Sequence, residues 1–137
     1  MSLKVGYAVC NINPELGFGV MGYYVPRHVK GFLDDLETSA VVLQFGEKRI
    51  AVISVDVCSL TVEQADEIKK TVAERSGINA DCIFISTIHT HTGPVLFSTR
   101  HTEVANDLYN EMLSCKISDV VCLAMQDLKP VTLKTGL

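Results

Sequence analysis

The stretch that decides the fold is Ile50-Ala51-Val52-Ile53-Ser54-Val55-Asp56-Val57, an apolar run rich in β-branched residues. It predicts a strand over residues 49–57, and residues 82–88 have the same character and predict a buried strand. A helix fits between them, because Thr61 and Gln64 have the spacing of a capping box and Gly77 can end the helix. The apolar stripe expected on it is Val62, Ala65, Ile68 and Val72. Together these three elements predict a right-handed βαβ unit.

The rest of the chain adds elements to the same sheet. Residues 4–12 predict a strand, residues 14–35 a long ordered loop, and residues 39–45 a hairpin with the 49–57 strand. Thr102 is expected to cap a second helix that Pro130 ends, and residues 131–133 a last strand. The stripe expected on this helix is Val104, Leu108, Met112 and Cys115. We therefore expect one α/β domain over residues 1–137, with a mixed β-sheet, a βαβ unit and flanking helices. We interpret it as an N-terminal fragment of a longer catalytic domain.

Composition narrows the functional classes. The chain has 137 residues, of which 47% are hydrophobic and 20% charged, so it can form a single folded core. The net charge is −4 without a basic cluster, which argues against a nucleic-acid partner. No apolar stretch approaches the ~20 residues that span a bilayer. The 5 cysteines are irregularly spaced, so we expect them to be reduced and mostly buried. With no visible signal peptide, they predict a cytoplasmic protein, although a secreted parent is not excluded.

The clearest chemical motif is Ser86-Thr87-Ile88-His89-Thr90-His91-Thr92-Gly93-Pro94. If the segment is extended, His89 and His91 point the same way, because strand side chains alternate with a period of two. Two imidazoles at this spacing can bind one transition metal, or they can be two polar residues at a strand end. The first interpretation gains weight because ligand sites in open α/β sheets lie at the carboxyl ends of strands.

Asp56 interrupts its apolar run close to the same expected edge of the sheet. A carboxylate that is buried without a partner is costly, so we expect Asp56 to have one. It could be a metal ligand, an acceptor for the outer nitrogen of His89, or the cap of a turn. The residues alone leave these three roles open.

Other patterns carry less weight. Gly17-Phe18-Gly19-Val20-Met21-Gly22 has the dinucleotide-binding spacing, but Pro14 precedes it and Pro26 blocks the helix that must follow. We expect these glycines to allow close approach of the backbone to another group. Ser86, His91 and Asp56 could formally make a Ser-His-Asp catalytic triad. The sequence has no G-x-S-x-G motif to expose the serine, which argues against it. His28 and His101 are expected to be solvated surface residues, although either could approach the pocket.

Four segments together resemble the N-terminal part of the neutral/alkaline non-lysosomal ceramidase family. They are Met21-Gly22-Tyr23, the strands around residues 39–42 and 52–56, and the block from His89 to Pro94. The order and spacing of these segments match over residues 4 to about 96. Ser39 stands where the family usually has Arg, and Val95 where it usually has Gly.

The resemblance implies a zinc-dependent hydrolase of sphingolipid metabolism that cleaves the amide of N-acyl sphingoid lipids. It implies that His89 is a zinc ligand, that His91 and Asp56 are catalytic residues, and that Gly22 lies near the substrate head group. His91 would then stabilise the reacting group or move a proton. The family's other zinc ligands lie beyond Leu137, so this chain is expected to bind zinc weakly or not at all and to be incomplete as an enzyme.

The alternative function is a non-catalytic assembly domain with a vestigial metal site. We also expect a homo-oligomer, because a chain cut after a sheet strand exposes apolar surface that its missing half would cover, and such surface drives association.

Overall fold

The computed structural model describes residues 2–99 and 105–136. Its strands are β1 (Leu3–Asn11), β2 (Glu37–Phe45), β3 (Lys48–Val55), β4 (Ile83–Thr87) and β5 (Lys129–Pro130). Its helices are α1 (Val62–Ser76), α2 (Asp107–Gln126) and a short 3₁₀ helix, Ala80–Cys82. Within the described ranges, no helix is long and apolar enough to cross a bilayer.

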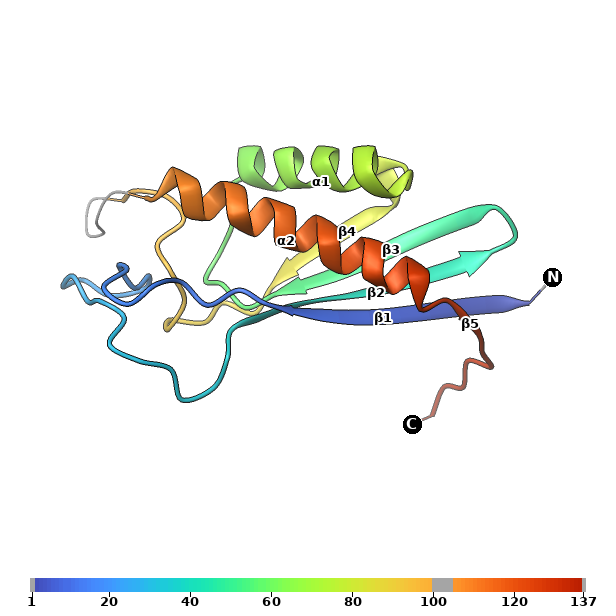
Figure 1. Ribbon diagram of the computed structural model, residues 1–137, viewed down its shortest axis with the longest axis horizontal. Coiled ribbons are helices and arrows are strands. Elements are labelled where there is room, and N and C mark those ends of the chain that lie inside the picture. The colour runs from blue at the N-terminus through green and yellow to red at the C-terminus, as the bar shows by residue number, and fades with distance from the viewer. Residues whose placement is uncertain (1, 100–104, 137) are drawn as a thin grey trace.

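The five strands form one mixed sheet in the order β4-β3-β2-β1-β5. β3 and β4 run parallel, and β1, β2, β3 and β5 pair antiparallel. Both helices lie on the same side of this sheet (Figure 1), with α1 beside α2. The structure confirms the predicted α/β class. It also confirms the hairpin of β2 and β3 and the parallel βαβ unit of β3, α1 and β4.

The core fills the space between the sheet and the two helices. Ala40, Val42, Ile53 and Val55 lie on the helix-facing side of the sheet and are at most 1% exposed. They pack in one cluster with Ile68, Val72, Leu113 and Ile117 of the helices. Gly6 lets α2 cross β1 closely, because a Cβ there would lie 1.8 Å from the carbonyl oxygen of Ala124.

No helix among the described residues covers the opposite face of the sheet (Figure 1), yet the side chains on this face are also apolar. The register places Tyr7 beside Val41, Val41 beside Val52, and Val52 beside Phe84. Tyr7, Val52 and Phe84 are 45–57% exposed. A sheet with apolar residues on both faces is typical of one that is covered on both sides.

The local signals of α1 are confirmed. The Thr61 side chain accepts from the backbone of Gln64, whose side chain accepts from the backbone N–H of Thr61 in return. Gly77 ends the helix in the left-handed conformation, with φ of 72°. Of the expected stripe, Ile68 and Val72 are buried, but Val62, in the first turn, is 72% exposed.

The predicted second helix is correct in place but wrong in phase. Asn106 caps it by accepting from the backbone N–H of Tyr109, whereas Thr102 and Val104 lie outside the described residues, as does His101. Leu108 is 76% exposed and Cys115 is exposed, while Tyr109, Leu113 and Ile117 are buried. A shift of one position turns the stripe by about 100° around the helix, so the face that packs differs from the one predicted.

Three further expectations need correction. The strand predicted over residues 49–57 ends at Val55, so Asp56 and Val57 belong to the following loop. The strand predicted as buried is the edge strand β4, on which Phe84 is exposed. The last strand is not residues 131–133 but Lys129–Pro130, which pair with Val5 and Lys4 of β1.

All five cysteines are unpaired, as expected, but only Cys58 is buried.

Candidate metal centre

The candidate site lies at the edge of the sheet where the parallel strands β3 and β4 end. Cys58 follows β3 and His89 follows β4, and the register of these strands pairs Val55 with Thr87. Residues far apart in the chain therefore meet at one edge, as the βαβ unit predicted.

The two histidines converge, although not for the expected reason. His89 has φ of 59°, a left-handed conformation that few non-glycine residues adopt, so the chain turns instead of continuing as a strand. The turn brings Nε2 of His91 to 3.4 Å from Nε2 of His89, with ring centroids 5.1 Å apart. Both histidines are exposed to solvent.

Cys58 completes the group. Its carbonyl oxygen lies 3.0 Å from Nδ1 of His89, and its Sγ lies 3.8 Å from the same nitrogen. One ligand atom from each of Cys58, His89 and His91 can be chosen so that all three lie within 4.8 Å of one another. Thiolate and imidazole are both good zinc ligands, so this donor set fits a zinc ion.

The glycine-rich loop lies against this group, as the sequence predicted. Backbone hydrogen bonds join Met21 to Gly93 and Val95 to Gly19, both at 2.9 Å. A Cβ on Gly22 would lie 2.4 Å from Cγ of His91, so the absence of a side chain there lets the ring take its position. The loop does not open a helix, which agrees with rejecting the dinucleotide-binding pattern.

Asp56 lies at the same edge of the sheet as His89, as predicted. Its Oδ2 accepts from the backbone N–H of Glu37 at 3.0 Å, and its own N–H donates to the Glu37 carbonyl. Asp56 thus has a partner, as expected, but that partner is the first residue of β2, 19 positions away, so none of the three roles left open is shown. Its catalytic role remains a prediction, and Asp56 does not belong to the three-residue group. Ser86 lies within the edge strand and His28 within the loop.

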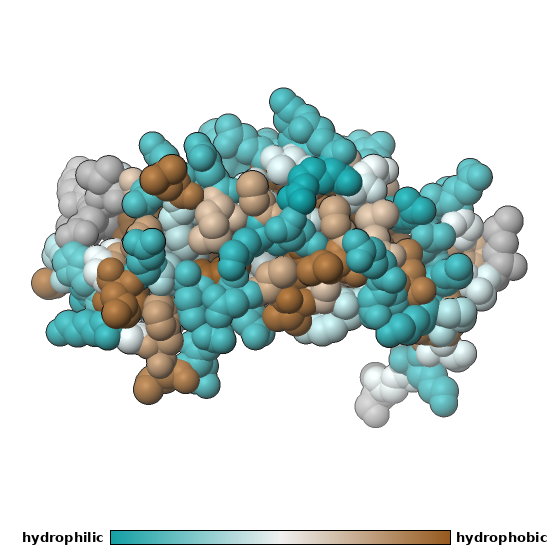
Figure 2. All heavy atoms as spheres, viewed as in Figure 1, coloured by the Kyte–Doolittle hydropathy of each residue, from teal (hydrophilic) through white to brown (hydrophobic). Residues whose placement is uncertain are grey.

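Aromatic and cationic side chains extend the site outward. The Tyr23 ring meets the His91 ring edge-on at 6.2 Å, and the Arg27 guanidinium lies 4.0 Å above the Tyr23 ring. Tyr23, Arg27, Phe32 and Thr92 help to line a hollow of about 440 Å³. Hydrophobic side chains also gather at the surface of this loop end of the molecule (Figure 2).

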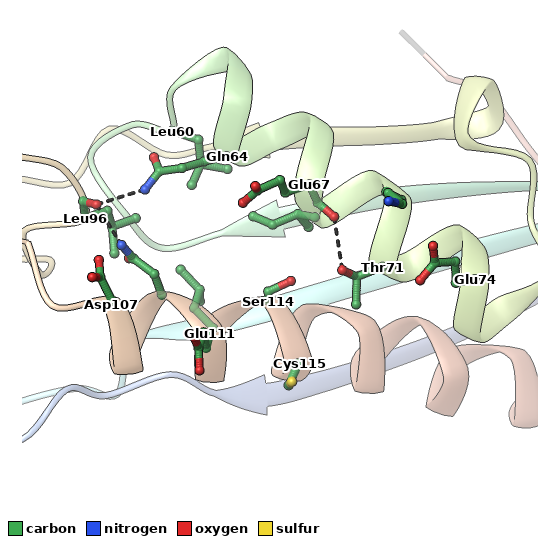
Figure 3. A pocket seen from close by; sticks show the side chains of 14 residues that line it. Leu60, Gln64, Glu67, Thr71, Glu74, Leu96, Asp107, Glu111, Ser114 and Cys115 are labelled. Carbon is green, nitrogen blue, oxygen red and sulfur yellow. Dashed lines mark hydrogen bonds between the residues drawn. The ribbon is translucent and has the colours of Figure 1, made fainter.

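A second hollow, of about 700 Å³, lies between α1 and α2 and is separate from the histidines. Figure 3 shows carboxylates of Glu67, Glu74, Asp107 and Glu111 around it. The amides of Gln64 and Asn110 both donate to the carbonyl of Leu96, at 2.8 and 2.9 Å, which ties the two helices to the loop. Gln64 and Asn110 therefore have a structural role.

Sequence reasoning missed Cys58. Its spacing in the sequence predicts only a buried small hydrophobe like the other cysteines. In the structure Cys58 does pack with Met21 and Val95. Its position two residues after Asp56, at the end of a parallel strand, was the signal that could have distinguished it.

Comparisons with known proteins bear on the fold. No protein-family model and no curated protein matches the chain. Among solved structures, neutral ceramidase from Pseudomonas aeruginosa matches with a TM-score of 0.78 at 19% identity, and a ceramidase complexed with C2 matches with the same score at 17% identity. Each match covers 95% of this chain and 22% of the other, so the chain spans about a fifth of the proteins it resembles. The chain therefore has the fold of one part of neutral ceramidase, as the sequence motifs predicted.

Proposed function

We propose that this chain is the N-terminal part of a metal-dependent amidohydrolase that cleaves N-acyl sphingoid or related lipids. The observation that carries the proposal is the convergence of His89 and His91 at the carboxyl end of β4. The ceramidase-like fold adds support, because the neighbours are ceramidases.

The proposal gives each residue of the site a task. A bound zinc ion would supply a water nucleophile at neutral pH and polarise the amide carbonyl. His89 would hold such an ion through Nε2, because its Nδ1 faces the Cys58 carbonyl. Nε2 of His91 lies close enough to reach the ion or the reacting group, where it can bind or exchange a proton.

The surroundings suit a lipid amide. The backbone of Gly22 lies directly against the His91 ring, so a substrate head group that contacts this imidazole also lies near Gly22. The neighbouring hollow has Phe32 and Leu33 in its wall, which can contact an apolar chain.

The first prediction separates the two histidines. We expect His89→Ala to lose both zinc and amide hydrolysis in the protein made from the complete reading frame, since no neighbouring side chain replaces its nitrogen. If His91 only moves protons, His91→Ala should keep zinc and lower turnover by about 10²–10⁴-fold. The measurements are zinc stoichiometry and hydrolysis of a short-chain N-acyl sphingosine, in parallel for each variant.

The matched control is His28→Ala, which removes a histidine outside the three-residue group. It should retain the metal content of the parent. Full zinc and full activity in His89→Ala would show that the metal assignment is wrong.

The second candidate function is an assembly domain, which the apolar open face of the sheet favours. A reading frame that encodes a further His, Glu and Tyr after this segment would support the enzyme. A stop codon directly after Leu137 would support the assembly domain.

A further inference from the structure

We propose that the groove between α1 and α2 is a docking site for a basic amphipathic helix of a partner protein. This groove is the hollow of about 700 Å³ described above. Among the described residues that line it, none belongs to the group of Cys58, His89 and His91. The inference goes beyond the proposed function, because it concerns another part of the molecule and holds whether or not the histidines bind an ion.

The groove is held open by contacts between the two helices and the loop before α2. Near one end, the amides of Gln64 and Asn110 both donate to the Leu96 carbonyl. Near the other end, Arg75 of α1 pairs with Asp119 of α2 at 2.5 Å. The spacing of the helices is therefore fixed before any partner binds, so that docking requires little rearrangement.

Apolar side chains form the floor of the groove. Ile68, Leu96 and Leu113 line it and are at most 5% exposed, and Leu60 lies beside them at one end (Figure 3). A hollow with an apolar floor between two helices is a surface on which a third helix can lay its own apolar face.

The rim determines the charge of the partner. Among the described residues that line the groove, Lys70 is the one cation, whereas carboxylates come from both helices, namely Glu67, Glu74, Asp107 and Glu111 (Figure 3). The ion pairs found among the described residues use none of these four carboxylates. An acidic rim favours a cationic partner and disfavours an anionic one, because complementary potentials attract and like charges repel.

The spacing of the carboxylates suits a helix. Glu67 and Glu74 are seven positions apart on α1, which is a rise of about 10.5 Å. Asp107 and Glu111 are four positions apart on α2, which is a rise of about 6 Å. Lysines or arginines at positions i, i+4 and i+7 of a partner helix rise by the same two distances. Placed beside an apolar stripe, they can meet carboxylates on both rims.

An unpaired acceptor in the wall of the groove also calls for a donor. The side-chain nitrogen of Asn110 donates to the Leu96 carbonyl at 2.9 Å, which fixes the orientation of the amide. The side-chain oxygen of Asn110 is then buried without a hydrogen-bond partner among the described residues. An acceptor left in this state is costly, and an ammonium or guanidinium group that enters the groove supplies the missing hydrogen bond.

The test uses the 137-residue protein and a synthetic helical peptide of about 14 residues, with a leucine stripe flanked by lysines at i, i+4 and i+7. We expect fluorescence anisotropy of the labelled peptide to show saturable binding that weakens as the salt concentration rises. Glu67→Lys with Glu111→Lys should weaken this binding by at least about tenfold, because it reverses one charge on each rim. Glu15→Lys with Glu47→Lys is the matched control, since it changes the net charge equally at exposed positions outside the groove, and it should bind within about twofold of the parent.

A measurement on the unaltered protein covers the case in which a variant does not fold. In NMR spectra recorded during titration with the peptide, the side-chain amides of Gln64 and Asn110 and the backbone signals of Thr71 and Ser114 should shift. Shifts confined to other surfaces, an absence of saturable binding, or equal affinities of the two double variants would overturn the inference.

Spermine separates recognition of a helix from attraction of charge alone, because it is cationic and lacks an apolar stripe. It should bind at least about tenfold more weakly than the peptide, since it makes little contact with the apolar floor. Equal binding of spermine and peptide would overturn the inference that a helix is the partner.

Discussion

Gly22 and Gly17 share a left-handed backbone, with φ of 97° and 89°, but only Gly22 has a neighbour where a side chain would point. A Cβ on Gly22 would overlap the His91 ring, whereas a Cβ on Gly17 would meet nothing within 4 Å. The two positions therefore separate the cost of backbone strain from the cost of displacing His91.

We predict that Gly22→Ala lowers zinc affinity by at least about tenfold, because the ring must move away from His89. Gly17→Ala carries a similar backbone strain and should bind zinc as the parent does. Isothermal titration with zinc, alongside thermal melts of both apo variants, measures the effect. Equal affinities for the two variants would show that Gly22 does not position His91.

His89 itself stands in a conformation that costs free energy, since a non-glycine residue at φ of 59° is uncommon. Such positions cluster at functional sites, where the surrounding structure enforces them. Here the turn at His89 is what directs both imidazoles toward the same point.

The contact between α2 and β1 depends on Gly6. The helix backbone approaches the strand so closely that a methyl group on Gly6 would meet a carbonyl oxygen, which cannot rotate away as a side chain can. The helix must then lift from the sheet or the strand must bend.

We predict that Gly6→Ala destabilises the fold by about 3 kcal/mol, at the upper end of the ~1–3 kcal/mol that overpacking costs. Gly31→Ala is the matched control, because its Cβ meets open space, and we expect a change within about 0.5 kcal/mol. Urea unfolding followed by circular dichroism gives both values. A Gly6→Ala protein as stable as the parent would mean that α2 does not lie against β1 in the way described.

Tyr109 connects the start of α2 to the residue that follows β1. Its hydroxyl donates to the carbonyl of Ile12, and its ring packs 5.3 Å from that of Phe18. Burial raises the pKa of this hydroxyl, so it stays protonated and able to donate at all physiological pH values. Through Phe18, this contact holds the glycine-rich loop that lies against His91.

In the part of the chain that the structure describes, the helices cover one face of the sheet and leave the other open (Figure 1). The open face is a continuous band of apolar side chains, namely Leu3, Val5, Tyr7, Val9, Val41, Leu43, Phe45, Ile50, Val52 and Phe84. Contiguous apolar patches of this kind mark contact surfaces, so we expect two copies of this chain to associate through it.

We predict that the double change Tyr7→Lys and Phe84→Lys weakens self-association by at least about tenfold, because burial of a large apolar side chain contributes ~1.5–3 kcal/mol. Val62→Lys with Leu108→Lys is the control, since it places the same two charges at exposed positions on the helices. Light scattering across a concentration series measures both proteins. A parent chain that stays monomeric at high concentration would contradict the association.

The sequence by itself determined the elements whose signals are local. The capping box at Thr61, the stop at Gly77 and the β-branched run at residues 50–55 identify α1 and β3, because each depends on neighbours within a few residues. The His89–Pro94 block and the Met21–Tyr23 segment also predict the fold that this chain shares with part of neutral ceramidase.

Only the tertiary structure decided which faces are covered and which side chains meet. The phase of α2 is set by its packing on β1 and β2, and the burial of each cysteine by what lies above it, so neither is written in local spacing. Cys58 and His89 are 31 positions apart in the chain, and only the parallel pairing of β3 and β4 brings them together. The two histidines meet because of the turn at His89 and the space left by Gly22, which are long-range packing effects that a period-two pattern does not contain.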